Sequence, residues 1–99
     1  MNDNKQKPEK STQDVVCPAE RCVIREPLKN FTEQMELKLR KNDHKGGWTN
    51  CDIRYLINRL RSELLELDYA IRLDDNRMIV DEAVDVANFA MMIADNHRV

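Results

Sequence analysis

The stretch from about residue 77 to residue 95 limits the possible folds most, because it has the pattern of a helix that is apolar on nearly every side. Its apolar residues are Met78, Ile79, Val80, Ala83, Val84, Val86, Ala87, Phe89, Ala90, Met91, Met92, Ile93 and Ala94. Such a helix is normally buried on all sides, and two further helices of the same chain cannot enclose it. About seventy ordered residues also form only a marginal core. We therefore predict an all-α helical bundle completed by homo-oligomerisation, as a homodimer or homotetramer, with this helix in the subunit interface.

A first amphipathic helix is expected to begin at Asn30, because Asn30 and Glu33 together resemble a capping box. Its apolar stripe consists of Leu28, Phe31, Met35 and Leu39. We expect this helix to end near Asn42. The loop at residues 43–48 contains two adjacent glycines, which stop a helix and allow the backbone to come close to a ligand.

A second amphipathic helix is expected to begin at Thr49 or Asn50 and to end before a turn at residues 74–76. Its apolar stripe consists of Ile53, Leu56, Ile57, Leu60, Leu64, Leu67 and Ile71. At 100° per residue, Glu63 and Glu66 fall on the same side of this stripe. They are therefore expected at the border of the buried face.

The first 29 residues differ in character from the rest of the chain. Residues 1–13 contain only one apolar residue, the initiating methionine, so we predict a disordered tail. Residues 14–29 are expected to form an irregular arm, because Pro18 and Pro27 interrupt any long element. The predicted helical domain is residues 30–99.

Composition restricts the classes of partner. The chain has two Gly and three Pro, which argues against a turn-rich β fold, and a net charge of −2, which provides no broad basic surface for nucleic acid. It has no apolar run of the roughly 18 residues that a membrane span needs, and its N-terminus has no apolar signal core. We expect a cytoplasmic protein that binds neither nucleic acid nor membrane.

Two short acidic patterns carry the expected chemistry. Glu63 and Glu66 form one pair, and Glu82 and Asp85 form the other; within each pair the carboxylates are three residues apart. Residues at this spacing are neighbours on one face of a helix, so two such pairs that face each other would offer four carboxylates to a hard cation such as Mg²⁺ or Mn²⁺. The alternative for Glu63 and Glu66 is a solvated helix face paired with Arg59 or Arg72. That alternative is weaker for Glu82 and Asp85, because an acid on a buried helix is costly unless it is paired or bound to a cation.

The pattern ExxE, a gap of fifteen residues, then ExxD resembles the all-α nucleoside triphosphate pyrophosphohydrolases, including MazG-like proteins, across roughly residues 31–96. The resemblance implies a reaction: Mg²⁺-dependent hydrolysis of the α–β phosphoanhydride bond of a nucleoside triphosphate, giving the monophosphate and pyrophosphate. It also implies that Glu63, Glu66, Glu82 and Asp85 hold Mg²⁺, for which Mn²⁺ is a possible substitute. Glu63 and Glu66 are the catalytic candidates, and the sequence does not decide which carboxylate takes the proton from water.

Substrate contacts are expected near the end of the first helix, in the loop and one turn beyond Asp85. A triphosphate needs positive partners, and an aromatic ring beside glycines can stack on a base. The candidates are Lys38, Lys41, His44, Lys45, Trp48 and Asn88. The alternatives are a solvated basic turn, an exposed histidine and a tryptophan that anchors the loop by packing.

Three cysteines, Cys17, Cys22 and Cys51, cannot all pair within one chain. They are interpreted as incidental thiols, because a zinc site that also used His44 would lack the usual CxxC spacing.

Two other functions remain open. One is a non-catalytic helical protein that oligomerises or binds a partner. The other is phosphoribosyl-ATP pyrophosphohydrolysis, which the same resemblance covers. The chain has one such domain where larger MazG proteins have two, and no residue identifies the base. A role in deoxynucleotide pool control or house-cleaning is the expectation.

Overall fold

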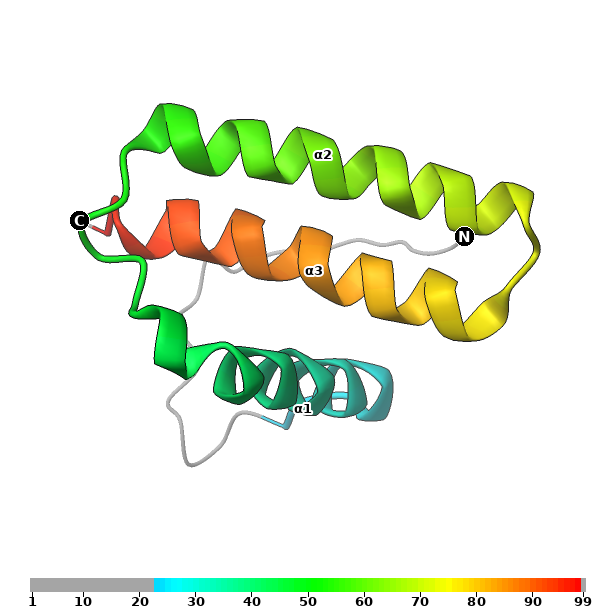
Figure 1. Cartoon of the computed structure of the whole chain (residues 1–99). Coiled ribbons are helices and arrows are strands. Elements are labelled where there is room, and N and C mark those ends of the chain that lie inside the picture. Colours follow the sequence, from blue (N-terminus) through cyan, green and yellow to red (C-terminus); the bar gives the residue numbers. More distant parts are fainter. Residues whose placement is uncertain (1–22, 99) are drawn as a thin grey trace, which may run out of the picture.

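The computed structural model describes residues 23–98, and in this range the chain forms helices and no strand. The elements are α1 (Glu26–Lys41), the short 3-10 helix η2 (Asp43–Lys45), α2 (Ile53–Arg72) and α3 (Asn76–Asp95). In Figure 1, α3 lies between α2 and α1. The all-α class expected from the sequence is confirmed.

Helices α2 and α3 form an antiparallel hairpin with a very short connection. Asp74 closes the turn with a positive φ of 55°, a conformation that Asp tolerates better than most residues. Asp75 then caps α3, because its side chain accepts a hydrogen bond from the backbone N–H of Met78 at 3.2 Å. The predicted turn is therefore present, with Asn76 as the first residue of α3.

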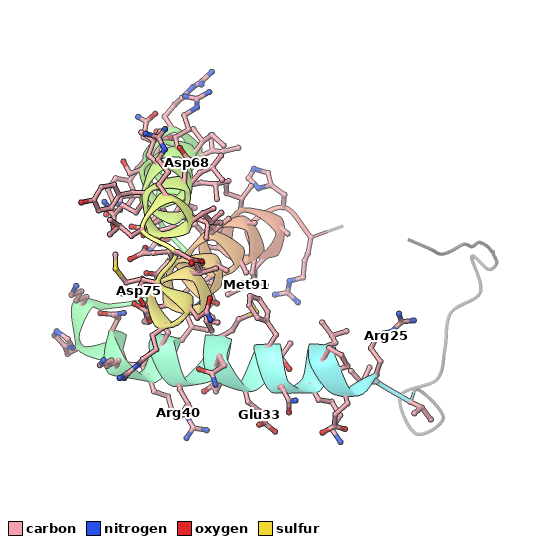
Figure 2. All side chains as sticks on the ribbon, turned by 90° about the vertical axis from the view of Figure 1, so that its right-hand side faces the viewer. Arg25, Glu33, Arg40, Asp68, Asp75 and Met91 are labelled. Atoms are coloured by element: carbon pink, nitrogen blue, oxygen red, sulfur yellow. The ribbon has the colours of Figure 1, made fainter. Side chains whose placement is uncertain are left out.

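Helix α1 crosses the hairpin on the α3 side. Figure 2 shows α1 along its length while α2 and α3 are seen nearly end-on, and Glu33 and Arg40 point away from α3. The half-buried residues of α1 are Phe31, Met35, Lys38 and Leu39. Their spacing of three or four residues makes one face. Lys38 is thus placed on the inward face, among apolar residues.

The expected start of the first helix at Asn30 is wrong. Helix α1 begins four residues earlier, at Glu26, so residues 26–29 of the expected irregular arm are helical. Pro27 does not interrupt it, since proline is tolerated in the first turn, where its missing N–H would have no helical partner. Asn30 therefore lies inside the helix. The predictions for residues 1–22 lie outside the described residues.

The expected start of the second helix at Thr49 or Asn50 is also wrong, because α2 begins at Ile53. The backbone at Trp48–Cys51 forms a turn instead, in which the Cys51 N–H donates to the Trp48 carbonyl at 3.0 Å. Gly46, with a φ of 89°, adopts a backbone conformation that favours glycine.

The rotation of α2 about its axis differs from the expected one. The buried residues of α2 are Leu56, Glu63 and Ala70, which recur every seven residues and face α3. Glu63 is therefore in the middle of the buried face, not at its border. Part of the apolar stripe is left at the surface: Leu64 is 55% exposed and Ile71 54%.

The core of the described chain is small. Its fully buried apolar residues are Leu56, Ala70 and Val84. Helix α3 is flanked by α1 and α2 but not enclosed by them, since Val80 is 49% exposed and Ala90 and Ala94 are also exposed. Among the helices of residues 23–98, none combines the length and the apolar character needed to cross a membrane.

Candidate functional site

The hairpin brings acids from both patterns together. Glu63, Glu66 and Glu82 each offer a carboxylate oxygen, and these oxygens lie within 4.8 Å of one another. A second group with the same spacing consists of Asp81, Glu82 and Asp85. Glu82 belongs to both groups, so the four predicted ligands, together with Asp81, form two overlapping clusters joined at Glu82.

Glu63 is buried and held by Arg59. Its side chain is only 7% exposed, and its Oε2 accepts a hydrogen bond from Arg59 Nη2 at 2.9 Å. The Arg59 guanidinium also lies over the Phe89 ring, 5.3 Å from its centroid, a geometry typical of a cation–π contact. The pairing with arginine that was the alternative for Glu63 is thus present, inside the cluster and not on a solvated face.

The protonation of Glu82 is perturbed by its surroundings. Burial raises its pKa, and a hydrogen bond to Glu63 and the charges of Glu66, Asp85 and Glu63 raise it further, to about 7. Burial also raises the pKa of Glu63, with the hydrogen bond to Glu82 acting in the opposite direction. A proton on Glu82 would relieve the repulsion between its carboxyl group and that of Glu63.

One oxygen of Glu82 has no partner. Its Oε1 is buried and accepts no hydrogen bond within the described chain. A buried acceptor without a donor is unfavourable, and it lies here beside two other carboxylates. The donor set consists only of carboxylate oxygens, the ligand type that Mg²⁺ and Mn²⁺ prefer. The residues present therefore fit such an ion.

Lys38 is joined to the second cluster. Its Nζ lies 2.8 Å from Asp81 Oδ1 and 3.0 Å from Asp85 Oδ1. Burial lowers the pKa of Lys38, but the hydrogen bonds and charges of Asp81 and Asp85 outweigh that effect and raise it. The ammonium thus remains charged and neutralises two acids of α3. The sequence indicated Lys38 as a phosphate partner and did not predict this pairing.

Asn88 is buried between α3 and α1. It is 3% exposed, and its Nδ2 donates to the Met35 carbonyl at 3.2 Å, while its Oδ1 has no partner within the described chain. Its amide therefore serves the contact between the two helices. No hydrogen bond among the described residues joins it to the carboxylates.

Trp48 is attached to the end of α3. Its Nε1 donates to Asp95 Oδ2 at 3.0 Å, and its carbonyl accepts from Asn96 Nδ2 at 3.0 Å. These contacts favour the interpretation that Trp48 anchors the loop. Asp95 is ten residues beyond Asp85, about 15 Å along the helix axis, so the indole lies well away from the acids.

The other predicted substrate residues, Lys41, His44 and Lys45, are exposed at the end of α1 and in η2. No hydrogen bond or ion pair within residues 23–98 joins them to the four carboxylates. Gly46 and Gly47 border this loop, and a Cβ atom added to either would meet no atom within 4 Å.

A surface hollow lies between α1 and the start of α3. It has a volume of about 660 Å³ and is lined by Gln34, Asn76, Arg77, Met78, Val80 and Asp81. It adjoins the second acidic cluster through Asp81 but is not lined by Glu63 or Glu66. A smaller hollow of about 370 Å³ lies on α2, lined by Leu64, Leu65, Leu67, Asp68 and Ile71.

The structure places Arg59 and Asp81, which were not among the predicted site residues, beside the acids of the two patterns. A signal for each was present in the sequence. Arg59 precedes Glu63 by four residues, the spacing of a helical ion pair. Asp81 is one of the acids on the apolar third helix.

Cys51 is half-buried and a free thiol, and neither it nor His44 belongs to a metal-compatible cluster of the described residues. Cys17 and Cys22 lie outside that range.

Comparisons with known proteins found no match for this chain among protein-family models, curated proteins or solved structures.

Proposed function

We propose that this protein is a Mg²⁺-dependent nucleoside triphosphate pyrophosphohydrolase that converts a (d)NTP and water to the (d)NMP and pyrophosphate. The observation that carries this proposal is the convergence of Glu63, Glu66 and Glu82, with the buried Oε1 of Glu82 unpartnered. Acids that are brought together in a partly buried position repel one another unless a cation neutralises them. The resemblance of the two acidic patterns to the all-α pyrophosphohydrolases supplies the reaction.

Glu63, Glu66, Glu82 and Asp85 are the residues that would hold Mg²⁺, with Mn²⁺ as a substitute. When bound, the cation would polarise the α–β phosphoanhydride and lower the pKa of an attacking water. Two-metal sites are common in phosphoryl chemistry, and the two overlapping acidic clusters are compatible with one ion or two.

Glu63 and Glu66 are assigned different roles in the proposed reaction. Arg59 holds Glu63 in a fixed orientation, which suits a ligand better than a base. Glu66 is exposed, so it is the glutamate that can reach water at the open side of the cluster. We assign to Glu66 the acceptance of the proton from the attacking water.

A triphosphate carries a charge of about −4, and it would enter a site that is already acidic. Lys38 lies at this site, and Lys41 follows one turn later on α1. The hollow beside Asp81 falls within the volume range of about 300–1,000 Å³ typical of small-molecule sites. A deoxynucleotide substrate, in pool control or house-cleaning, fits the proposal.

The proposal includes a homo-oligomer, and it adds a face of α2 to the contact on the third helix that the sequence predicts. The exposed apolar residues of α2 include Ile53, Leu64, Leu65 and Ile71, and the smaller hollow lies among them. Three fully buried apolar residues make a small core for a stable domain. A second copy packed on this face would cover the part of the stripe that α3 leaves open.

The test is pyrophosphate release by the purified protein on a panel of ribo- and deoxynucleoside triphosphates and phosphoribosyl-ATP, with Mg²⁺ or with EDTA. Metal-dependent release of pyrophosphate without free phosphate supports the proposal, and the ranking identifies the base. No turnover on any substrate contradicts it.

The second candidate is a non-catalytic oligomerisation or interaction protein, and the exposed apolar face of α2 favours it. It predicts that Mg²⁺ together with a nucleotide leaves the melting temperature unchanged. A rise of several degrees would contradict it, because a ligand that binds only the folded state stabilises that state.

A further inference from the structure

Lys38 occupies a position at which a cation of the chain competes with a cation from solution. Its Nζ contacts both Asp81 Oδ1 and Asp85 Oδ1, at 2.8 and 3.0 Å. Asp85 is also a proposed ligand of the divalent ion. Because the ammonium and the ion are both positive, each weakens the hold of the other on the same carboxylate.

The two partners of Lys38 differ in exposure. The Asp85 side chain is 23% exposed and the Asp81 side chain 59%. Asp81 thus offers the ammonium a position nearer to solvent and beside the larger hollow, which Asp81 helps to line. The flexible four-carbon stem of lysine permits such a move.

We propose that Lys38 is an exchangeable internal counter-ion: it neutralises Asp85 in the metal-free protein, releases Asp85 when a divalent cation binds, and then contacts a phosphate oxygen of the substrate. This inference rests on the proposed function. It makes Lys38 a positioning residue in the metal-free protein and a substrate contact in the loaded one. It also explains how a phosphate-binding lysine can be placed among acids without permanently blocking them.

The first experiment measures Mn²⁺ binding to the full chain without nucleotide, by titration calorimetry and by the electron paramagnetic resonance signal of free Mn²⁺. Lys38→Met removes the competing charge and keeps the apolar stem. It is expected to bind Mn²⁺ about ten-fold more tightly than the wild type. Lys38→Arg, which keeps the charge, is expected to remain within about three-fold. Lys29→Met, on an exposed part of α1, is the matched control and is expected to leave the affinity unchanged.

A second measurement needs no variant and so does not depend on the folding of Lys38→Met. The wild type is labelled with an amine-reactive reagent, and modification of each lysine is quantified by mass spectrometry. Saturating Mg²⁺ is expected to increase labelling of Lys38 at least about three-fold relative to EDTA, with Lys29 unchanged. Addition of inorganic triphosphate with the metal is expected to protect Lys38 again.

The outcomes separate the two proposals. The counter-ion role is wrong if the wild type binds Mn²⁺ and Lys38→Met binds it equally well or more weakly. It is also wrong if labelling of Lys38 does not respond to Mg²⁺. In both cases the proposed metal site is unaffected. A purely structural Lys38 gives that same result, together with a lower melting temperature. If neither the wild type nor Lys38→Met binds Mn²⁺, the proposed function fails and this inference fails with it.

Discussion

A carboxylate oxygen of Glu82 on α3 lies within 4.8 Å of one of Glu63 on α2, across the interface of the helical hairpin. The pair is stable only while it holds a proton or has a cation nearby, because two ionised carboxylates at this distance repel each other. We therefore expect the interface of α2 and α3 to respond to pH and, under the proposed function, to divalent ions.

The first prediction concerns stability and pH in the presence of EDTA. The pKa of Glu82 is about 7 in the folded chain, against an ordinary 4.5. The folded state therefore binds more protons than the unfolded state between these values, and stability falls as pH rises from about 4.5 to 7. We expect a loss of roughly 1–3 kcal/mol over this interval, after solvent screening.

Thermal unfolding at a series of pH values measures this loss. Glu82→Gln is expected to flatten the dependence, and Glu33→Gln, on the outer side of α1, to retain it. A wild-type melting temperature that rises between pH 5 and pH 7.5 would show that the Glu63–Glu82 pair is not the dominant titrating group.

The second prediction concerns turnover. Glu82 belongs to both acidic clusters. We therefore expect Glu82→Gln to lower the affinity of the proposed site for Mg²⁺ more than the loss of any other single acid does. We expect Mg²⁺-dependent pyrophosphate release to fall at least about 100-fold, with the oligomeric state by gel filtration unchanged. Glu33→Gln is the control and is expected to keep full activity. Full activity of Glu82→Gln would remove the basis for the proposed metal site.

The third prediction concerns Trp48. Trp48→Phe keeps an aromatic ring but removes the indole N–H that donates to Asp95. We expect unfolding to become easier by about 1 kcal/mol, with KM for the best nucleotide within about two-fold of the wild type. A large rise in KM without loss of stability would instead assign the ring to stacking on the base.

The fourth prediction concerns Asn88, which joins α3 to α1. Asn88→Ala removes the side-chain donor that reaches the Met35 carbonyl of α1 and opens a small cavity. The expected cost is about 1–3 kcal/mol, measured by urea unfolding. Because α1 also carries Lys38, the same variant is expected to loosen the Lys38–Asp85 contact. Unchanged stability would mean that packing alone holds α1 on α3.

The fifth prediction concerns the oligomer. Leu65 is 72% exposed on α2, and Leu37 is 59% exposed on α1. Leu65→Lys is expected to shift the protein to a smaller species in sedimentation velocity, whereas Leu37→Lys leaves the assembly intact. If both variants sediment as the wild type does, the α2 face is not the contact between copies.

The acidic patterns and the helical periodicity predicted the fold class, the turn at Asp74 and the meeting of Glu63 with Glu82. These features depend on residues close in sequence, where spacing determines which side chains share a face. The start of α1 differs from the expected one by four residues, because Pro27 lies in the first turn of the helix and does not interrupt it. The start of α2 differs by three or four residues, because the carbonyl of Trp48 is engaged in a turn.

The pairing of Lys38 with Asp85 and that of Trp48 with Asp95 each span 47 residues. Such contacts depend on how α1 crosses α3, which no local pattern encodes. The rotation of α2 that buries Glu63 and leaves Leu64 exposed is likewise set by packing between helices. For that reason the sequence placed Glu63 at the border of the buried face.

The short connection at Asp74 also has a consequence for the order of folding. All four carboxylates belong to the α2–α3 hairpin, which closes a short loop and so loses little chain entropy. Docking of α1 on α3 closes a much longer loop, since Lys38 and Asp85 are 47 residues apart. Local contacts form readily before distant ones. We therefore expect the hairpin to bring its carboxylates together before α1 docks, so that early in folding Asp81 and Asp85 lack the neutralising charge of Lys38.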